Sequence, residues 1–158
     1  LLCDKKLIII KNLFNKETYT EIINRINSLT PATQRQWGKM NAAQMLAHCK
    51  EAFKVPLSDK KMPRMFLGLL LGWAIKKKLY NEEPWKRNLP TAPNFIIKDE
   101  RDFEKEKQEL VGMINQFHNA GPGNVGKFPH PMFGSFTPEQ WGQSMYKHLD
   151  HHLMQFGV

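Results

Sequence analysis

The sequence contains few cysteines and no long apolar stretch, and both absences exclude classes of protein. Cys3 and Cys49 are the only cysteines among 158 residues, which excludes a disulfide framework and a CxxC redox pair and favours reduced thiols in a cytoplasmic protein. The longest apolar run, MFLGLLLGWAI at 65–75, has 11 residues, whereas a membrane-spanning helix needs about 20. We therefore expect no stable membrane insertion. The opening LLCDKKLIII contains two lysines and is not followed by a small-residue cleavage site, so we expect no secretory signal there.

Acidic residues are outnumbered by basic ones. The chain has 23 lysines and arginines against 15 aspartates and glutamates, which gives a formal net charge of +8. Many of the basic residues lie in one part of the chain: Lys60, Lys61, Arg64, Lys76, Lys77, Lys78, Lys86 and Arg87. Because no DNA- or RNA-binding motif accompanies them, we expect no nucleic-acid partner. We interpret the cluster as a solvated basic face or a preference for anionic ligands.

The chain also lacks internal repeats and low-complexity segments, and its length is that of one ordinary domain. We predict a single domain over residues 1–158. Apolar periodicity and capping signals predict helices over residues 14–29, 41–55, 63–80, 99–120 and 137–157. The LIII stretch at 7–10 fits a short strand or an extended arm, but it has no partner strand. The predicted fold is therefore all-α, a four-helix bundle with an extra short helix or long loops.

The last predicted helix has the clearest boundaries. Thr137 and Gln140 form a capping box, Pro138 stands at the first helical position, and Gly157 ends the helix. The N-caps expected for the other amphipathic helices are Asn15, Asn41 and Asp99. His118, near the end of the fourth helix, is expected to be a solvent-facing C-terminal cap.

The final helix carries two histidines on its apolar face. Residues at steps of four, three and four form this face: Trp141, Met145, His148 and His152. His148 and His152 are one turn apart, so both imidazoles can reach one metal ion. Histidines near a helix C-terminus also complement the helix dipole, so a structural role for the pair stays open. His151 lies about 60° away from the stripe.

A third histidine, His48, lies on the inward stripe of the second predicted helix. The stripe consists of Met45, His48, Ala52 and Val55. A lone histidine on an apolar face is usually a satisfied core residue, but three on the inward faces of two helices are what a catalytic metal site requires. Cys49 is about 100° round the helix from His48, so its thiol should point away from the same ion.

The third predicted helix is apolar in its first part and basic at its end. Gly68 and Gly72, four residues apart, would allow the close approach of another helix. We expect the segment to be buried between neighbouring helices. The alternative is a basic amphipathic helix that lies on a membrane surface.

Two loops add further candidates. Residues 81–97 contain three prolines and form a long irregular stretch, in which Trp85 and Phe95 either line a substrate pocket or tack the loop down. We favour the second role and keep Trp85 as a candidate substrate contact. His130 stands between two prolines in the glycine- and proline-rich segment 121–136, and it is a candidate ligand or substrate contact.

Two parts of the sequence resemble the DinB-like, or YfiT-like, metalloenzyme superfamily. The run His148-Leu-Asp-His151-His152-Leu-Met-Gln155 is similar to the final-helix signature of that family. In the signature a histidine is followed by two adjacent histidines three and four residues on, and then by a glutamine. His48, in NAAQMLAHCKEA, matches the histidine of the family's second helix. The phrases WGKMNAAQMLAHC and HPMFGSFTPEQWGQSMYKHLDHHLMQFG resemble an uncharacterised branch of the superfamily.

The resemblance implies a four-helix bundle in which His48, His148 and His152 hold a divalent metal ion, zinc or nickel, while His151 is not a ligand. Family members with known activities transfer low-molecular-weight thiols or isomerise thiol adducts, and others are described as hydrolases. Many relatives have Arg-Gly after the paired histidines, where this chain has Leu-Met at 153–154. A substrate or thiol contact by that arginine therefore does not carry over.

The expected function is that of a metal-dependent enzyme, a thiol S-transferase or a hydrolase that acts on a small molecule. Three histidines leave one position of the ion open for water or a thiolate. Glu51, one turn beyond His48, is the candidate general base. The alternatives are a metal-binding bundle without catalysis, and a bundle that binds a membrane surface or a partner through its basic third helix. A homodimer is also compatible with the sequence.

Overall fold

The computed structural model describes residues 10–91 and 93–158, and this part of the chain is helical. The helices are α1 (Lys16–Ser28), α2 (Ala42–Phe53), α3 (Phe66–Lys76), α4 (Phe103–Ala120) and α5 (Pro138–Gln155), with short 3-10 helices η1 (Lys77–Leu79) and η2 (Pro93–Phe95). No β-strand occurs among the described residues, where His130 and Gly134 form an isolated bridge. The all-α class is therefore confirmed. Of the predicted strand or arm at 7–10, only Ile10 is described, and it belongs to no regular element.

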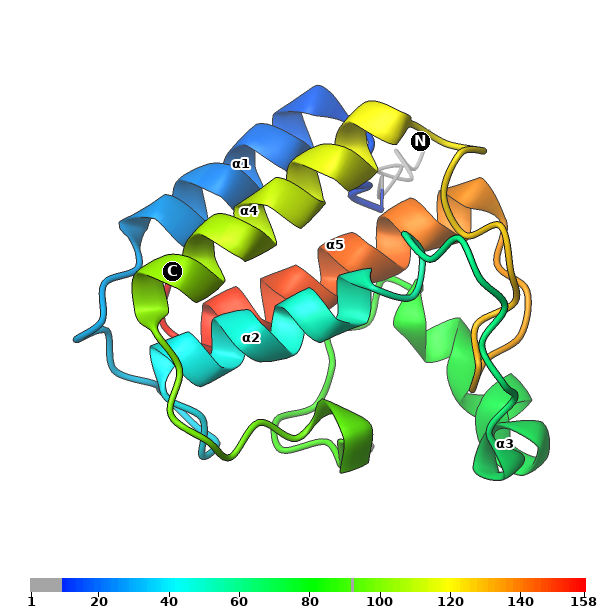
Figure 1. Ribbon diagram of the computed structural model, residues 1–158, viewed down its shortest axis with the longest axis horizontal. Helices are drawn as coiled ribbons and strands as arrows, with labels where there is room; N and C mark the ends of the chain where they lie inside the picture. Colours follow the sequence, from blue (N-terminus) through cyan, green and yellow to red (C-terminus); the bar gives the residue numbers. More distant parts are fainter. Residues whose placement is uncertain (1–9, 92) are drawn as a thin grey trace, which may run out of the picture.

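Helices α1, α2, α4 and α5 pack around one apolar core (Figure 1). Helix α2 lies along α4 and also contacts α5, and α1 contacts both α4 and α5. The largest fully buried side chains include Leu13, Ile22, Ile26, Met45, Leu46, Phe53, Leu110, Ile114, Phe117, Leu149 and Leu153. Burying one such side chain contributes about 1.5–3 kcal/mol. Because α2 and α5 share this core, residues on their inward faces are brought together.

Capping boxes begin the two helices that carry the candidate ligands. Thr137 Oγ1 accepts from the Gln140 amide at 3.2 Å, and Gln140 Oε1 accepts from the Thr137 amide at 3.1 Å. Asn41 and Gln44 make the same pair of bonds at the start of α2, at 2.9 and 3.0 Å. Both predicted caps are confirmed. Each box satisfies N–H groups that have no partner inside the helix, and so it fixes the residue at which the helix begins.

Helix α4 ends at Ala120 as predicted, but its start and the role of His118 differ from the prediction. Its N-cap is Asp102, whose side chain accepts from the Lys105 amide at 2.8 Å, whereas Asp99 forms an ion pair with Arg101 at 2.9 Å. The expected start at Asp99 is therefore wrong by one turn. His118 is not a solvent-facing cap, because its Nδ1 donates to the Leu13 carbonyl at 2.9 Å and its ring stacks on Tyr19 with centroids 4.1 Å apart.

Helix α3 is not buried between neighbouring helices. It stands apart from α1, α2, α4 and α5 (Figure 1) and exposes several large apolar side chains. The expected close approach at Gly68 and Gly72 does occur, but its partner is a loop: a Cβ at either glycine would collide with the backbone of Met132. Over the residues that the structure describes, no helix is both long and apolar enough to cross a membrane.

Candidate metal centre

Three imidazoles meet between α2 and α5. His48 comes from α2, and His148 and His152 come from successive turns of α5. One ring nitrogen from each residue lies within 4.8 Å of the other two, and the Nε2 atoms of His48 and His148 are 3.1 Å apart. His48 and His152 are only 5% and 9% exposed, and His148 is partly buried. The structure thus brings together the three residues that the sequence predicted as ligands.

Hydrogen bonds fix the proton on two of these rings. His48 Nδ1 lies 2.8 Å from the Phe95 carbonyl oxygen. His152 Nδ1 lies 3.0 Å from Gln155 Oε1, and the amide nitrogen of Gln155 donates to the Trp37 carbonyl at 2.8 Å. Because these oxygens can only accept, both Nδ1 atoms are the donors. Each Nε2 then keeps its lone pair, which is the arrangement of histidines that bind metal ions.

The three histidines fit a divalent ion by spacing and by donor type. Bonds of 2.0–2.1 Å in a tetrahedral zinc site separate the ligand nitrogens by about 3.3 Å. The Nε2 atoms of His48 and His148 are already close to that separation, at 3.1 Å. His148 Nδ1 is buried and has no hydrogen-bond partner among the described residues. Nε2 is therefore the nitrogen through which His148 meets His48, another candidate ligand.

Burial keeps all three rings neutral at pH 7. It lowers the pKa of His152 to about 3, and the nearby His48 lowers this pKa further. Burial, followed by the three neighbouring histidines, lowers the pKa of His148 well below its usual range. Burial also lowers the pKa of His48, although the hydrogen bond to Phe95 and the charge of Glu51 oppose the shift. Neutral imidazole is the form that binds a metal ion.

A groove of about 640 Å³ opens beside this centre and includes His48 and His152 in its lining. Its apolar walls come from Trp37, Met40, Leu89, Phe95, Ile96 and Ile97. Its polar lining includes Lys39, Gln44, Asn88, Lys98, His151 and Gln155. The centre therefore borders a space large enough for a small molecule, with cationic and amide groups on an otherwise apolar wall.

His151 and Trp85 lie next to the three ligands without joining them. His151 is outside the group of converging nitrogens, in agreement with the prediction, but it lines the groove. The Trp85 ring is 5.8 Å from the ring of His148 and 5.5 Å from that of His151. Trp85 Nε1 also donates to the Lys78 carbonyl at 2.8 Å. Trp85 thus tacks its loop down beside two histidines. It is not part of the groove lining, so its role as a substrate contact stays a prediction.

The structure does not bring His130 or Glu51 to the groove. His130 Nδ1 accepts from the backbone amides of Met132 and Phe133 at 3.0 and 3.3 Å, and the residue belongs neither to the histidine group nor to the groove lining. Its expected role as a ligand or substrate contact therefore gains no support, and the ring instead shapes its own loop. Glu51 is not in the groove lining either, and its carboxylate accepts from Lys54 at 2.5 Å. The general-base role predicted for Glu51 gains no support.

Cys49 behaves as predicted. Its thiol is buried and points to Met45, with the two sulfur atoms 3.7 Å apart, and it is absent from the converging group. Burial raises the pKa of this thiol far above its usual range. A protonated thiol is a poor metal ligand, so the centre is built from imidazoles alone.

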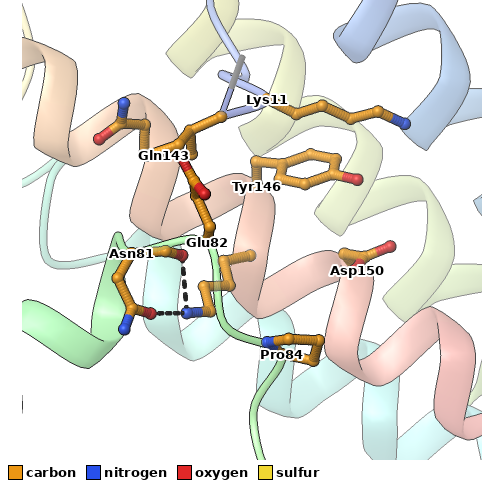
Figure 2. Close-up of a pocket in the computed structure, with 9 residues that line it drawn as sticks. Lys11, Asn81, Glu82, Pro84, Gln143, Tyr146 and Asp150 are labelled. Atoms are coloured by element: carbon orange, nitrogen blue, oxygen red, sulfur yellow. Dashed lines mark hydrogen bonds between the residues drawn. The ribbon is translucent and has the colours of Figure 1, made fainter. Parts of the chain in front are cut away.

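A smaller hollow of about 170 Å³ lies on another side of α5 (Figure 2). Its lining includes Lys11, Tyr146, Lys147 and Asp150 but no histidine or cysteine. The Lys147 ammonium donates to the carbonyls of Lys78 and Asn81 at 2.7 and 2.9 Å, and also to the Asn81 side chain. These bonds fasten the segment after α3 to α5. We therefore assign the Lys147 contacts in this hollow a structural role: they hold the loop that carries Trp85.

Sequence reasoning missed several contacts and residues that complete the centre. The Gln155 side chain orients His152, and its position three residues further along the same helix is a spacing at which side chains meet. That signal was available in the sequence. The contact of His48 with Phe95 was not, because it uses a backbone carbonyl. Trp37, Lys39 and Lys98 come from loops whose paths no periodicity predicts.

Comparison with known proteins gives a family but no activity. No curated protein and no solved structure matches this sequence. A family model described as "Protein of unknown function (DUF1569)" matches residues 11–157. The match includes α1 to α5, and with them all three converging histidines. Because it covers nearly the whole chain, the protein belongs to the DUF1569 family.

Proposed function

We propose that the protein is a metal-dependent enzyme that acts on a small molecule, with a zinc or nickel ion held by His48, His148 and His152. The single observation that carries this proposal is the convergence of three neutral imidazoles beside an open groove. A structural zinc site has four protein ligands, whereas a catalytic site has three and an open position. The open position here would face the groove.

We further propose that the fold is a four-helix bundle of the DinB-like, or YfiT-like, type, formed by α1, α2, α4 and α5. The order of these helices and their shared core support this assignment. So does the position of the ligands, one on α2 and two on α5, followed by Gln155. In this scheme α3 and the long loops are additions to the bundle.

The chain's own residues prepare the site before any substrate binds. When bound, the ion would supply Lewis acidity and lower the pKa of a water molecule or thiol at its open position. Phe95 and Gln155 hold the rings of His48 and His152 so that each Nε2 faces the centre. Trp37 and Trp85 pack at ring distances of 6.0 and 5.5 Å from His151 and place apolar surface beside it.

The groove supports a substrate with an apolar body and a negative charge. Trp37, Leu89 and Ile96 offer apolar surface, while Lys39 and Lys98 place two cations in the lining. A low-molecular-weight thiol that carries carboxylates meets the charge requirement, since its carboxylates can approach the lysines while its sulfur reaches the centre. The proposed reaction is therefore transfer of such a thiol to a small electrophile, with hydrolysis of a small ester or amide as the alternative reaction of the same centre.

Turnover by metal-loaded protein tests this proposal. Protein loaded with zinc or nickel is incubated with carboxylate-bearing thiols and a chromogenic electrophile, and separately with chromogenic esters. We expect turnover in one of the two assays, lost in His148→Ala and kept in His130→Asn, which changes a partly buried histidine outside the centre. Stoichiometric metal binding without turnover in either assay would favour a metal-binding bundle without catalysis.

The two lysines provide a test of the substrate class. In Lys39→Ala/Lys98→Ala we expect a higher KM for a carboxylate-bearing thiol, an unchanged kcat, and an unchanged KM for an uncharged thiol. Lys16→Ala/Lys105→Ala, which removes two exposed lysines outside the groove, is the matched control. An equal rise in KM for both thiols would contradict a role for the two lysines in carboxylate recognition.

A further inference from the structure

Helix α3 presents an apolar face to solvent. Phe66, Leu70 and Trp73 are 75%, 57% and 79% exposed. They follow one another at steps of four and three residues, so they share one side of the helix. Two aromatic rings and a leucine on one exposed face form a patch of the kind that marks an interaction site.

The opposite face of α3 packs on a loop, which leaves the apolar patch facing solvent. A Cβ at Gly68 or Gly72 would collide with the backbone of Met132, so the helix rests directly on that loop. The Met65 amide also donates to the Pro131 carbonyl at 3.0 Å. Among the described residues α3 packs against no other α-helix. The glycine face is therefore occupied, while no part of the chain that the structure describes covers the face with Phe66 and Trp73.

Cations flank the patch on both sides in the sequence. Lys60, Lys61 and Arg64 precede α3, and Lys76, Lys77 and Lys78 follow its apolar part. Between residues 59 and 78 the only acid is Asp59. All of these cations are exposed except Lys76, which is partly buried and donates to the Ser135 carbonyl. The occupant of the patch must therefore accept apolar side chains and carry negative charge beside them.

We propose that α3 docks the protein on the surface of an anionic lipid bilayer. Phe66, Leu70 and Trp73 would enter the boundary between headgroups and acyl chains, and the flanking lysines and arginine would lie at the lipid phosphates. At 1.5 Å per residue, a helix of 11 residues is about 16 Å long, which suits a helix lying in the interface plane. A second copy of the chain fits less well, because pairing the same face would bring two sets of cations together.

Sedimentation of the full chain with vesicles tests this assignment. We expect binding to vesicles of phosphatidylcholine with about 30% phosphatidylserine, weak binding to phosphatidylcholine alone, and loss of binding as salt is raised. Phe66→Ser/Trp73→Ser should weaken binding by roughly tenfold or more. Lys77→Gln/Lys78→Gln should weaken it roughly 30-fold on the anionic vesicles. A chelator should have no effect, because α3 is separate from the histidine centre.

Matched controls keep the test decisive. Met154→Ser removes an exposed apolar side chain elsewhere, and Lys16→Gln/Lys105→Gln removes two exposed lysines elsewhere, so both should bind as the wild type does. If a serine variant fails to fold by circular dichroism, quenching by lipids brominated on the acyl chain replaces it. Fluorescence of the wild type should then be quenched, and Trp73→Phe should lose that quenching while still binding.

Three results would overturn the assignment. The first is no binding to anionic vesicles at low salt. The second is binding that the changes at Phe66 and Trp73 leave intact. The third is a dimer in the absence of lipid that Trp73→Ser dissociates, which would assign the face to a second copy of the chain.

Discussion

Buried or partly buried histidines occur in two regions beside α5, and the two regions use them in opposite ways. Near the start of the helix, the His130 ring is 6.0 Å from Trp141, and its Nδ1 accepts two backbone N–H groups. Near the end, Nδ1 of His48 and of His152 each donates to an oxygen, which leaves Nε2 with a lone pair. The direction of the Nδ1 hydrogen bond distinguishes His130 from His48 and His152. It does not mark a ligand by itself, because His118 Nδ1 also donates to a carbonyl while His118 lies outside the converging group.

The largest expected effect is on metal affinity. Removing a hydrogen-bond partner of a metal ligand typically weakens binding 10–100-fold, so losing the ligand itself in His152→Ala should weaken zinc or nickel binding by more than roughly 100-fold. His130→Asn, the matched change in the other region, should leave the affinity unchanged. Competition against a chromogenic chelator measures both. Equal metal affinities for the two variants would contradict the different roles assigned to the two regions.

Gln155 gives a second test of the comparison, because its effect on metal affinity should come through its hydrogen bond to His152. Gln155→Leu removes the acceptor of His152 Nδ1 and the donor to the Trp37 carbonyl. We expect metal affinity to fall by roughly 10–100-fold with the helical content unchanged. The control is Gln143→Leu on the same helix, whose side chain donates to Glu139 instead. If both glutamine variants bind metal as tightly as the wild type, His152 needs no orientation by Gln155.

Lowering the pH should reduce the stability of the protein through His130, the structural histidine. Burial, together with the charge of Arg64, lowers the pKa of His130 to about 4, whereas an unfolded histidine titrates near 6.5. As pH falls below 6.5 the unfolded chain takes up this proton before the folded one, so stability is lost down to about pH 4. The loss should reach about 3 kcal/mol of unfolding free energy.

The variant for this test is His130→Asn, which keeps a side-chain oxygen near the position of Nδ1 but cannot be protonated in this range. Urea unfolding of metal-free protein at pH 7 and at pH 4.5 measures the difference. The variant should lose less stability between these two pH values than the wild type loses. Parallel losses would mean that the folded protein does not depress the pKa of His130.

The smallest effect is expected at Lys147, which holds the loop of Trp85 against α5. Lys147→Met removes its bonds to the carbonyls of Lys78 and Asn81, and we expect a loss of about 1–3 kcal/mol of unfolding free energy. Lys105→Met, at an exposed position of α4, should change stability by less than about 0.5 kcal/mol. Equal midpoints in urea for the two variants would contradict this role of Lys147.

The sequence predicts the candidate centre better than it predicts the surroundings of the centre. Thr137, Asn41 and the turn-spaced pair His148 and His152 are local signals, and local spacing is enough to place them on helices and faces. His48 could be added because its helix is also amphipathic. These predictions depend on a few consecutive turns of helix and on no distant contact.

The failures share one physical cause, which is that the sequence does not say which neighbour a segment meets. An apolar helix with two close-packing glycines is compatible with burial, yet the partner of Gly68 and Gly72 is a loop, and Trp73 is left in solvent. His118 was expected to be an exposed cap, but it bonds to Leu13 and stacks on Tyr19, which come from another part of the chain. Tertiary contacts made by loops decide both cases.

The most direct test of the account is the metal content of the protein purified without a histidine tag or a chelator. Elemental analysis should find about one zinc, nickel or related ion per chain in the wild type and in His130→Asn. It should find none in His48→Ala, with the helical content unchanged. A folded wild-type protein that contains no metal, and that takes up neither zinc nor nickel when they are added, would reduce the three histidines to core residues and contradict the proposed metal centre.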